Sequence, residues 1–199
     1  MVIVAPNWLG DAVMALPAIA DVRAGRPGAT IAVAARASVA PLFSLVPGIS
    51  EVVTIPKGSS WPLSGYDTAI LLPNSFHSAM ATARAGVRER WGYRTDWRGM
   101  LLTRAIDRPT GALHQIDYYR HLVASLGFGS VSASAEREDA PRLEISPERR
   151  AAGRELLQRA GWDGVAPLVG IAPAPRTARR SDGPRPRLRI SPPASPRTA

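Results

Sequence analysis

Three segments of the chain place polar side chains directly after an apolar run, where such side chains can bind a ligand. The first segment ends in the carboxylate of Asp11, which follows the turn residue Gly10. The second offers an amide and two hydroxyl groups that can hold the oxygens of a polar ligand: Asn74, Ser75 and Ser78. The third carries Arg94 and Arg98, whose planar guanidinium groups can bind a phosphate through paired hydrogen bonds.

Each of these side chains also has an ordinary structural interpretation. A carboxylate at the start of a helix, such as Asp11, can cap free backbone N–H groups and contribute about 1 kcal/mol. Ser75 suits the N-cap position of a helix better than a ligand site. The two arginines can be solvated surface charges. The sequence leaves these alternatives open, and it assigns no role to Lys57, its one lysine.

The elements that must position these side chains follow from the hydrophobic pattern. Apolar runs predict buried strands over 2–5, 30–35, 51–55, 66–73, 89–94 and 167–172. Amphipathic segments between them predict helices over 11–24, 38–46, 75–86, 114–127 and 146–161. Apolar strands that alternate with helices indicate an α/β fold, with a parallel sheet covered on both faces. In such sheets ligands bind beyond the carboxyl ends of the strands, where the three polar segments lie.

Proline and glycine residues refine the helix boundaries. Pro17 falls inside the first predicted helix, where its missing N–H should kink or delay that helix. Gly86 and Gly127 suit the position that follows the end of a helix. Ser146 followed by Pro147 is typical of a helix start.

Composition and motifs exclude several classes of protein. The chain has no cysteine, which excludes disulfides and thiolate metal sites, and 45% of its residues are hydrophobic, enough for a core. Its start, MVIVAPNWLGD, lacks the basic region of a signal peptide, and no apolar run reaches membrane-spanning length. We therefore expect a cytoplasmic protein. The first loop has one glycine where a dinucleotide fingerprint needs three, which disfavours a dinucleotide-dependent enzyme.

The net charge of +9 does not indicate nucleic-acid binding, because of where the charge lies. Seven arginines and one aspartate within 173–199 account for six of the nine net positive charges. The rest of the chain has the modest charge of an ordinary soluble domain. The tail contains no aromatic residue, which disfavours a basic segment that binds RNA or an anionic membrane. We expect no nucleic-acid partner.

The histidines and large aromatic residues give weak signals. His114 and His121 stand seven residues apart on one face of a predicted helix, but no third metal ligand lies near them in the sequence. We therefore predict no metal site. Four aromatic residues are interpreted as packing residues: Trp91, Trp97, Tyr118 and Tyr119.

The first polar segment, NWLGDAVMALPAI, belongs to a set of three motifs that resembles a known family. The others are PNSFHSA (73–79) and GYRTDWRGMLL (92–102), and all three resemble the ADP-heptose:lipopolysaccharide heptosyltransferases, specifically the type that adds the second heptose to the inner core. The resemblance extends from the first strand to about Ala172. It implies a Rossmann-like sheet that forms the N-terminal half of a GT-B fold. It also implies an acceptor-binding domain over 1–160, and over 161–172 a linker with the first strand of a donor domain.

The resemblance further implies roles for individual residues. Inverting glycosyl transfer needs a base that takes the proton of the acceptor hydroxyl, and the family uses the aspartate of the Gly-Asp pair, here Asp11. The acceptor, heptosyl-Kdo-lipid A, carries phosphates and acidic sugars. Five residues are therefore expected to bind it: Asn74, Ser75, Ser78, Arg94 and Arg98. No DxD pair occurs, so no metal and no cofactor are expected. The donor is ADP-heptose, whose binding residues stay unassigned.

The tail from Pro173 onward departs from the family pattern. The family continues with a loop of the type PGAxxGxxKRWP, whereas this chain reads PAPRTARRSDGP. A GC-rich coding of PGAAYGTAKRWP that loses one G near its start translates into the twelve residues 173–184. We therefore hypothesise that a frameshift replaces the donor domain with a disordered tail over 173–199, and that the chain alone is inactive.

Two other functions compete with this interpretation. One is a small non-catalytic α/β binding protein whose basic tail contacts RNA or an anionic membrane. The other is the dinucleotide-dependent enzyme that the missing glycines disfavour. The heptosyltransferase interpretation explains both the body of the chain and the break at Pro173. It also implies peripheral contact with the inner face of the inner membrane, because the acceptor is a lipid.

Overall fold

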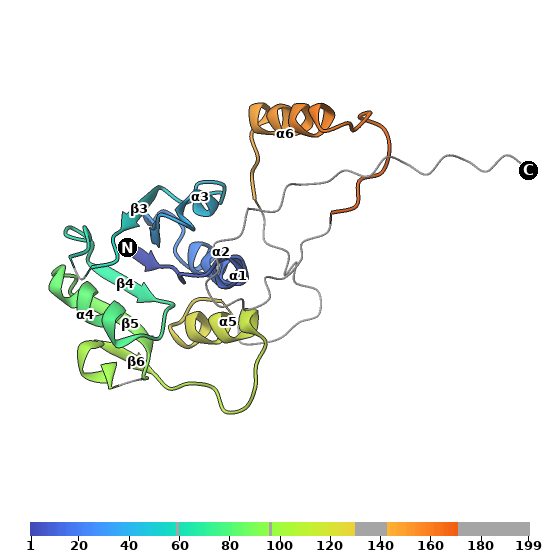
Figure 1. Ribbon diagram of the computed structural model, residues 1–199. Coiled ribbons are helices and arrows are strands. Elements are labelled where there is room, and N and C mark those ends of the chain that lie inside the picture. The colour runs from blue at the N-terminus through green and yellow to red at the C-terminus, as the bar shows by residue number, and fades with distance from the viewer. Residues whose placement is uncertain (59, 96, 130–142, 171–199) are drawn as a thin grey trace, which may run out of the picture. The chain divides into compact units, whose positions relative to one another are not determined.

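The computed structural model describes residues 1–58, 60–95, 97–129 and 143–170 (Figure 1). The chain divides into two units, Met1–Glu144 and Ile145–Ala199. The boundary expected near residue 160 therefore falls inside the second unit. The expected disorder of the tail over 173–199 concerns residues outside the described ranges.

One sheet of six parallel strands forms the centre of the first unit, in the order β3-β2-β1-β4-β5-β6. The strands are β1 (Val2–Val4), β2 (Ala32–Arg36), β3 (Glu51–Ile55), β4 (Thr68–Leu71), β5 (Glu89–Tyr93) and β6 (Arg104–Ile106). Val4 pairs with Ala34 on one side and with Leu71 on the other. The order of the strands reverses between β1 and β4, which makes the crevice beyond their carboxyl ends the expected ligand site. The Rossmann-like parallel sheet is thereby confirmed.

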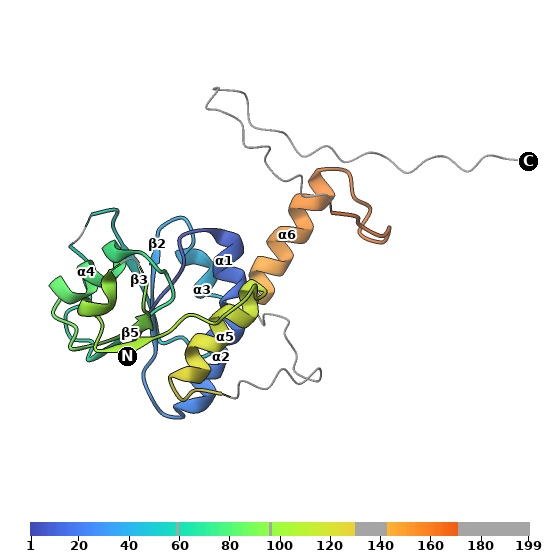
Figure 2. The ribbon, with the colours of Figure 1, turned by 90° about the horizontal axis from the view of Figure 1, so that it is seen from below.

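Helices cover both faces of this sheet (Figure 2). One face carries α1 (Leu9–Met14), α2 (Leu16–Gly25), α3 (Ala40–Phe43) and α5 (Gln115–Ser125). The other face carries α4 (Phe76–Arg84) and the short 3-10 helix η1 (Arg98–Leu101). Alternate strand residues point into the two layers, so Ile3 packs in the first core and Val4 in the second. Both layers are apolar, which explains why the strands read as continuous hydrophobic runs.

The first predicted helix, 11–24, is two helices in the structure. It starts at Leu9, stops at Ala15 and resumes as α2, with Pro17 near the start of α2. This confirms the expected effect of Pro17, because proline is tolerated in the first turn of a helix but not in its interior. Gly10 lies within α1 and is not among the glycines with positive φ, so the tight turn expected there is not present.

Three further elements differ from the sequence prediction. The strand β6 and the helix η1 were not predicted. Conversely, the described part of the strand expected over 167–172, residues 167–170, forms no strand. A strand needs a hydrogen-bonded neighbour, and every strand of the described sheet lies in the first unit.

The second unit contains the helix α6 (Pro147–Arg159). Ser146 is its N-cap and its hydroxyl accepts a hydrogen bond from the Arg149 N–H at 3.3 Å, which confirms the predicted helix start. No residue of α6 is buried. Throughout the described ranges, every helix is too short or too polar to cross a membrane.

Candidate active site

Polar residues gather at the edge of the sheet where the strands end. Asp11 follows β1, Asn74 follows β4, Arg94 follows β5 and Arg108 follows β6. Because all six strands are parallel, these residues share one edge of the sheet. The three polar segments expected from the sequence therefore meet there, and the loop after β6 joins them.

Asp11 lies in the first turn of α1, beside the switch point between β1 and β4. The N-cap residue of α1 is Trp8, and no side chain caps the helix. Among the described residues, Asp11 makes no capping hydrogen bond, although its carboxylate lies in the first turn of the helix. Within the described residues no hydrogen bond or ion pair engages the Asp11 carboxylate, which is only half-buried. An added Cβ on the neighbouring Gly10 would meet no atom within 4 Å, so the surface at the residue before Asp11 is open.

Asn74 connects the loop after β4 to helix α5. Its side-chain amide donates a hydrogen bond to the hydroxyl of Tyr118 at 2.8 Å, and its backbone oxygen accepts one from Thr95 Oγ1 at 2.8 Å. The Asn74 Oδ1 atom is buried and has no hydrogen-bond partner in the structure. A buried acceptor without a partner costs about 1–3 kcal/mol, and such costs are found at functional sites.

Ser75 and Ser78 both use their hydroxyl groups in hydrogen bonds within the chain. Ser75 is the N-cap of α4, and its Oγ accepts a hydrogen bond from the Ser78 N–H at 3.2 Å. This confirms the capping interpretation of Ser75. Ser78 is buried, and its hydroxyl donates to the Ser75 carbonyl at 2.7 Å. This burial and bonding favour a structural role for Ser78, and its contact with an acceptor stays a prediction.

Arg98 is fully buried, so it is not a solvated surface charge. Its Nε donates to the Tyr93 carbonyl at 2.8 Å, and its Nη1 donates to the carbonyl of Pro73. Nη1 also lies 3.5 Å from the carbonyl oxygen of Ser75 and 3.5 Å from Ser78 Oγ. The guanidinium thus ties the ends of β4 and β5 to the start of α4. This geometry favours a positioning role for Arg98, and its direct binding of a phosphate stays a prediction.

Gly92 is the residue that gives Arg98 its space. A Cβ at position 92 would lie 2.9 Å from Arg98 Nη2 and 3.2 Å from the Leu71 carbonyl oxygen. Gly92, the first glycine of the GYRTDWRG segment, is therefore required by packing. Trp97, directly before Arg98, has a positive φ of 60° and is 89% exposed.

Arg94 is the exposed arginine of the pair. Its Nε lies 3.5 Å from Asp107 Oδ1, and the two side chains are 61% and 82% exposed. An exposed ion pair of this kind contributes little to stability, so the Arg94 guanidinium can exchange Asp107 for a ligand anion. The structure therefore leaves Arg94 accessible to an acceptor, and its contact with one stays a prediction.

Helix α5 supplies residues that the sequence analysis treated only as packing. Tyr118 bonds Asn74, and its ring lies 4.6 Å from the ring of Tyr93. The hydroxyl of Tyr93 donates to the Tyr118 carbonyl at 2.7 Å and lies 2.8 Å from His121 Nδ1. Burial raises the pKa of Tyr93 well above its ordinary value. The sequence of this helix, HQIDYYRHL, did not predict its contacts with Asn74 and Tyr93, because these join segments more than twenty residues apart.

Tyr119 lies where α5 contacts α1. Burial raises the pKa of Tyr119 to about 12, and the negative charge of Asp11 acts in the same direction. His114, by contrast, is the N-cap of α5 and accepts a hydrogen bond from the Ile116 N–H at 3.3 Å. The two histidines therefore have separate roles. No cluster of three or more His, Asp or Glu that could hold a metal ion lies among the residues described.

Cations outnumber anions along this edge of the sheet. Arg36 ends β2, and it donates to the Pro56 carbonyl and, at 3.4 Å, to Asn7 Oδ1. Lys57 follows β3 and is exposed. Arg94 and Arg108 lie on the same edge, as do the carboxylates of Asp11 and Asp107. The excess of positive charge can attract a negatively charged ligand to this edge.

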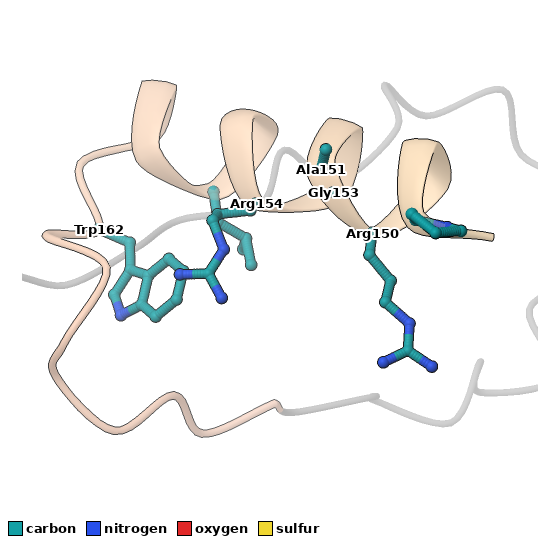
Figure 3. A pocket seen from close by; sticks show the side chains of 7 residues that line it. Arg150, Ala151, Gly153, Arg154 and Trp162 are labelled. Atoms are coloured by element: carbon teal, nitrogen blue, oxygen red, sulfur yellow. The ribbon is translucent and has the colours of Figure 1, made fainter. Parts of the chain in front are cut away.

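A separate hollow lies within the second unit (Figure 3). It measures about 640 Å³ and is lined by α6 and the segment that follows it. The Arg154 guanidinium lies 5.7 Å from the ring of Trp162, and Figure 3 shows Arg150 on the same side of the helix. Every lining residue belongs to the second unit, so the hollow is no part of the strand-end site.

Known proteins are similar to this chain in sequence and in fold. Residues 63–194 match the family model of glycosyltransferase family 9 (heptosyltransferase). The chain is 27% identical over 191 residues to lipopolysaccharide heptosyltransferase 2 of Escherichia coli strain K12, which covers 87% of this chain and 53% of that protein. The solved E. coli ADP-heptose LPS heptosyltransferase II has a TM-score of 0.61 at 27% identity, covering 78% of this chain and 50% of that one.

A third similarity concerns the fold alone. An E. coli heptosyltransferase solved with ADP has a TM-score of 0.60 at 20% identity, over 70% of this chain and 50% of that one. The chain thus spans about half the length of the relatives it matches. These similarities give no support to a small binding protein with a basic tail. The family match continues to residue 194, which lies within the tail, so it does not mark a break at Pro173. The frameshift hypothesis stays a prediction.

Proposed function

Because the chain belongs to glycosyltransferase family 9, the heptosyltransferases, we propose that it is the acceptor-binding half of an inverting lipopolysaccharide heptosyltransferase. The proposal assigns the strand-end edge of the sheet to the acceptor saccharide. The observation that carries it is the Asp11 carboxylate, which lies at the switch point with no hydrogen bond or ion pair recorded among the described residues. That carboxylate is available to a hydroxyl group of a bound ligand.

In the proposed reaction Asp11 takes the proton of the acceptor hydroxyl. The hydroxyl oxygen forms a bond to the anomeric carbon of the heptose as the bond from that carbon to the phosphate oxygen of ADP breaks, and ADP leaves with the electron pair. The anomeric centre carries oxocarbenium-like positive charge in between. Proton transfer by a positioned carboxylate contributes about 10²–10⁴-fold to such a rate.

The neighbours of Asp11 fit an anionic acceptor. Arg94 and Arg108 place positive charge at the ends of β5 and β6, and both are exposed. Asn74 offers an amide in the loop between them and Asp11. These groups would hold phosphates or acidic sugars of heptosyl-Kdo-lipid A near the base.

For the donor we propose ADP-heptose. Two solved E. coli proteins of similar fold support this: one heptosyltransferase contains bound ADP, and the other is described as an ADP-heptose LPS heptosyltransferase. The relatives are about twice as long as this chain, so the proposal leaves the donor to residues that the chain does not contain. We predict that the 199-residue chain, assayed by itself, shows no transfer activity.

We further propose that the protein works in the cytoplasm, in peripheral contact with the inner membrane. The acceptor is lipid-linked, so the acceptor site must approach a membrane surface. Trp8 and Trp97 support this, since both lie at the strand-end edge and are 78% and 89% exposed. Tryptophan favours the membrane–water interface. Co-sedimentation with vesicles containing anionic lipid should fall when both are changed to Ala.

The direct test of the proposed function is binding of the deacylated heptosyl-Kdo saccharide to the 199-residue chain, measured by calorimetry. The proposal predicts saturable binding that weakens as the salt concentration rises, because charged groups make the contacts. Failure to bind at any salt concentration would contradict it.

A further inference from the structure

Helix α5 places a second set of polar groups beside Asp11, and the proposed reaction has not used them. Tyr118 reaches the loop after β4, while its neighbour Tyr119 is buried close enough to Asp11 to feel its charge. The helix therefore lies against both strand-end loops that flank the switch point. A group held by Tyr118 would lie in the same crevice as the proposed base.

The hydroxyl of Tyr118 has one hydrogen still to donate. Its oxygen accepts the bond from Asn74 Nδ2 at 2.8 Å. Within the described residues its own hydrogen has no recorded acceptor. A phenol accepts and donates at once, so this hydroxyl is oriented by Asn74 and free to donate to a ligand oxygen.

The ring of Tyr118 is held in place on several sides. Tyr93 lies 4.6 Å from it and Tyr119 lies 6.0 Å from it, centroid to centroid. The guanidinium of Arg108 lies 5.7 Å from the ring centre on a third side. The buried hydroxyl of Tyr93 also fixes the helix by donating to the Tyr118 carbonyl. A donor that is held this firmly loses little conformational entropy when it binds.

Arg108 brings the charge that a lone phenol lacks. It follows β6, is exposed, and keeps its guanidinium beside the ring that carries the hydroxyl. A phenol hydrogen next to a guanidinium suits an oxyanion, either a phosphate or a carboxylate. We propose that Tyr118 and Arg108 bind an oxyanion of the acceptor saccharide and so position its hydroxyl next to Asp11. This inference rests on the proposed function.

The test uses the full 199-residue chain and calorimetry with the deacylated, phosphorylated heptosyl-Kdo saccharide. Tyr118→Phe and Arg108→Gln should each weaken binding about tenfold, as expected for a hydrogen bond to a charged group. The double variant should lose less than the product of the two, because both side chains bind the same oxyanion. A change within twofold for both single variants, in folded protein, would overturn the proposal.

Two matched controls lie at the opposite edge of the sheet. Tyr66→Phe removes a hydroxyl that donates to Glu51 Oε2 at 2.7 Å, before β4 begins. Arg88→Gln removes the same charge as Arg108→Gln from an exposed pair with Asp67. Both controls should bind the saccharide as the unchanged chain does. An equal loss of binding in the controls would assign the effect to net charge or stability and would overturn the proposal.

Further arms identify the oxyanion and separate the two proposals. If Tyr118→Phe still weakens binding of the dephosphorylated saccharide tenfold, the group is a sugar carboxylate. If it does so only with the phosphorylated saccharide, the group is a phosphate. If the unchanged chain binds neither saccharide, the proposed function fails and this inference fails with it. Should Tyr118→Phe not fold, Arg108→Gln decides alone, because that side chain is exposed.

Discussion

The side-chain amide of Asn74 donates a 2.8 Å hydrogen bond to the hydroxyl of Tyr118, which lies on a helix 44 residues further along the chain. This bond joins the loop after β4 to α5, and it orients the hydroxyl that we assign to the acceptor. It also offsets part of the cost of the buried Asn74 oxygen that has no partner.

Asn74→Ala removes a hydrogen bond that contributes about 1 kcal/mol, and it also removes the buried oxygen without a partner, whose cost is of similar size. The free energy of unfolding should therefore change by less than about 1 kcal/mol. Asn74→Ala should weaken binding of the acceptor saccharide, because Tyr118 loses its orientation. Asn7→Ala is the matched control at the end of β1, where the 3.4 Å contact with Arg36 is exposed. Urea unfolding should show little change for either variant, whereas saccharide binding should weaken for Asn74→Ala and not for Asn7→Ala. Equal effects of the two variants on binding would contradict the assignment.

Arg98 and Arg94 should differ sharply in stability, although they stand four residues apart in one motif. Arg98→Met leaves several buried carbonyl groups without a donor, so the free energy of unfolding should fall by about 3 kcal/mol or more. Arg94→Met removes only an exposed ion pair and should cost about 0–1 kcal/mol. Chemical denaturation of both variants measures the difference. Comparable losses of stability would mean that the hydrogen bonds of Arg98 to the ends of β4 and β5 do not stabilise the domain.

The contrast between these arginines shows which features the sequence could not predict. The hydrophobic pattern predicted the strands β1 to β5 and most helices, because burial on both faces leaves long apolar runs. It missed β6, which is three residues long and begins with Arg104. It also could not tell Arg98 from Arg94, since the buried position of Arg98 depends on hydrogen bonds such as that to the carbonyl of Pro73, 25 residues away in the sequence. The partnership of Asn74 and Tyr118 was hidden for the same reason.

Two of the glycines in the motifs, Gly92 and Gly10, should respond oppositely to alanine. At Gly92 the new Cβ would lie 2.9 Å from Arg98 Nη2, so Gly92→Ala should destabilise the domain by about 1–3 kcal/mol. At Gly10 the Cβ meets nothing, and alanine in a helix should stabilise it by roughly 0.5–1 kcal/mol. Thermal unfolding tests both signs. A stable Gly10→Ala variant with weakened saccharide binding would indicate that the ligand occupies the open surface at Gly10.

Alkaline pH should unfold the domain through its tyrosines. The folded-state pKa of Tyr119 is raised to about 12, above its ordinary value of 10.0, mainly by burial. Its contribution to stability is therefore complete below about pH 10 and is lost as the pH rises toward about 12. Tyr119→Phe should reduce this loss, measured by urea unfolding across that range. The same pH dependence in both proteins would show that Tyr119 does not carry the effect.

The central claim is that Asp11 is the base in heptosyl transfer, and the turnover rate of an Asp11 variant tests it most directly. The protein needed is the chain restored through PGAAYGTAKRWP and continued by a donor domain, with the 199-residue chain as an inactive comparison. Turnover of ADP-heptose with the heptosyl-Kdo acceptor is then measured for this protein and for its Asp11→Asn variant. We expect Asp11→Asn to lower turnover by about 10²-fold or more, with donor binding unchanged. Turnover within a few-fold of the unchanged protein would contradict the claim and place the base elsewhere.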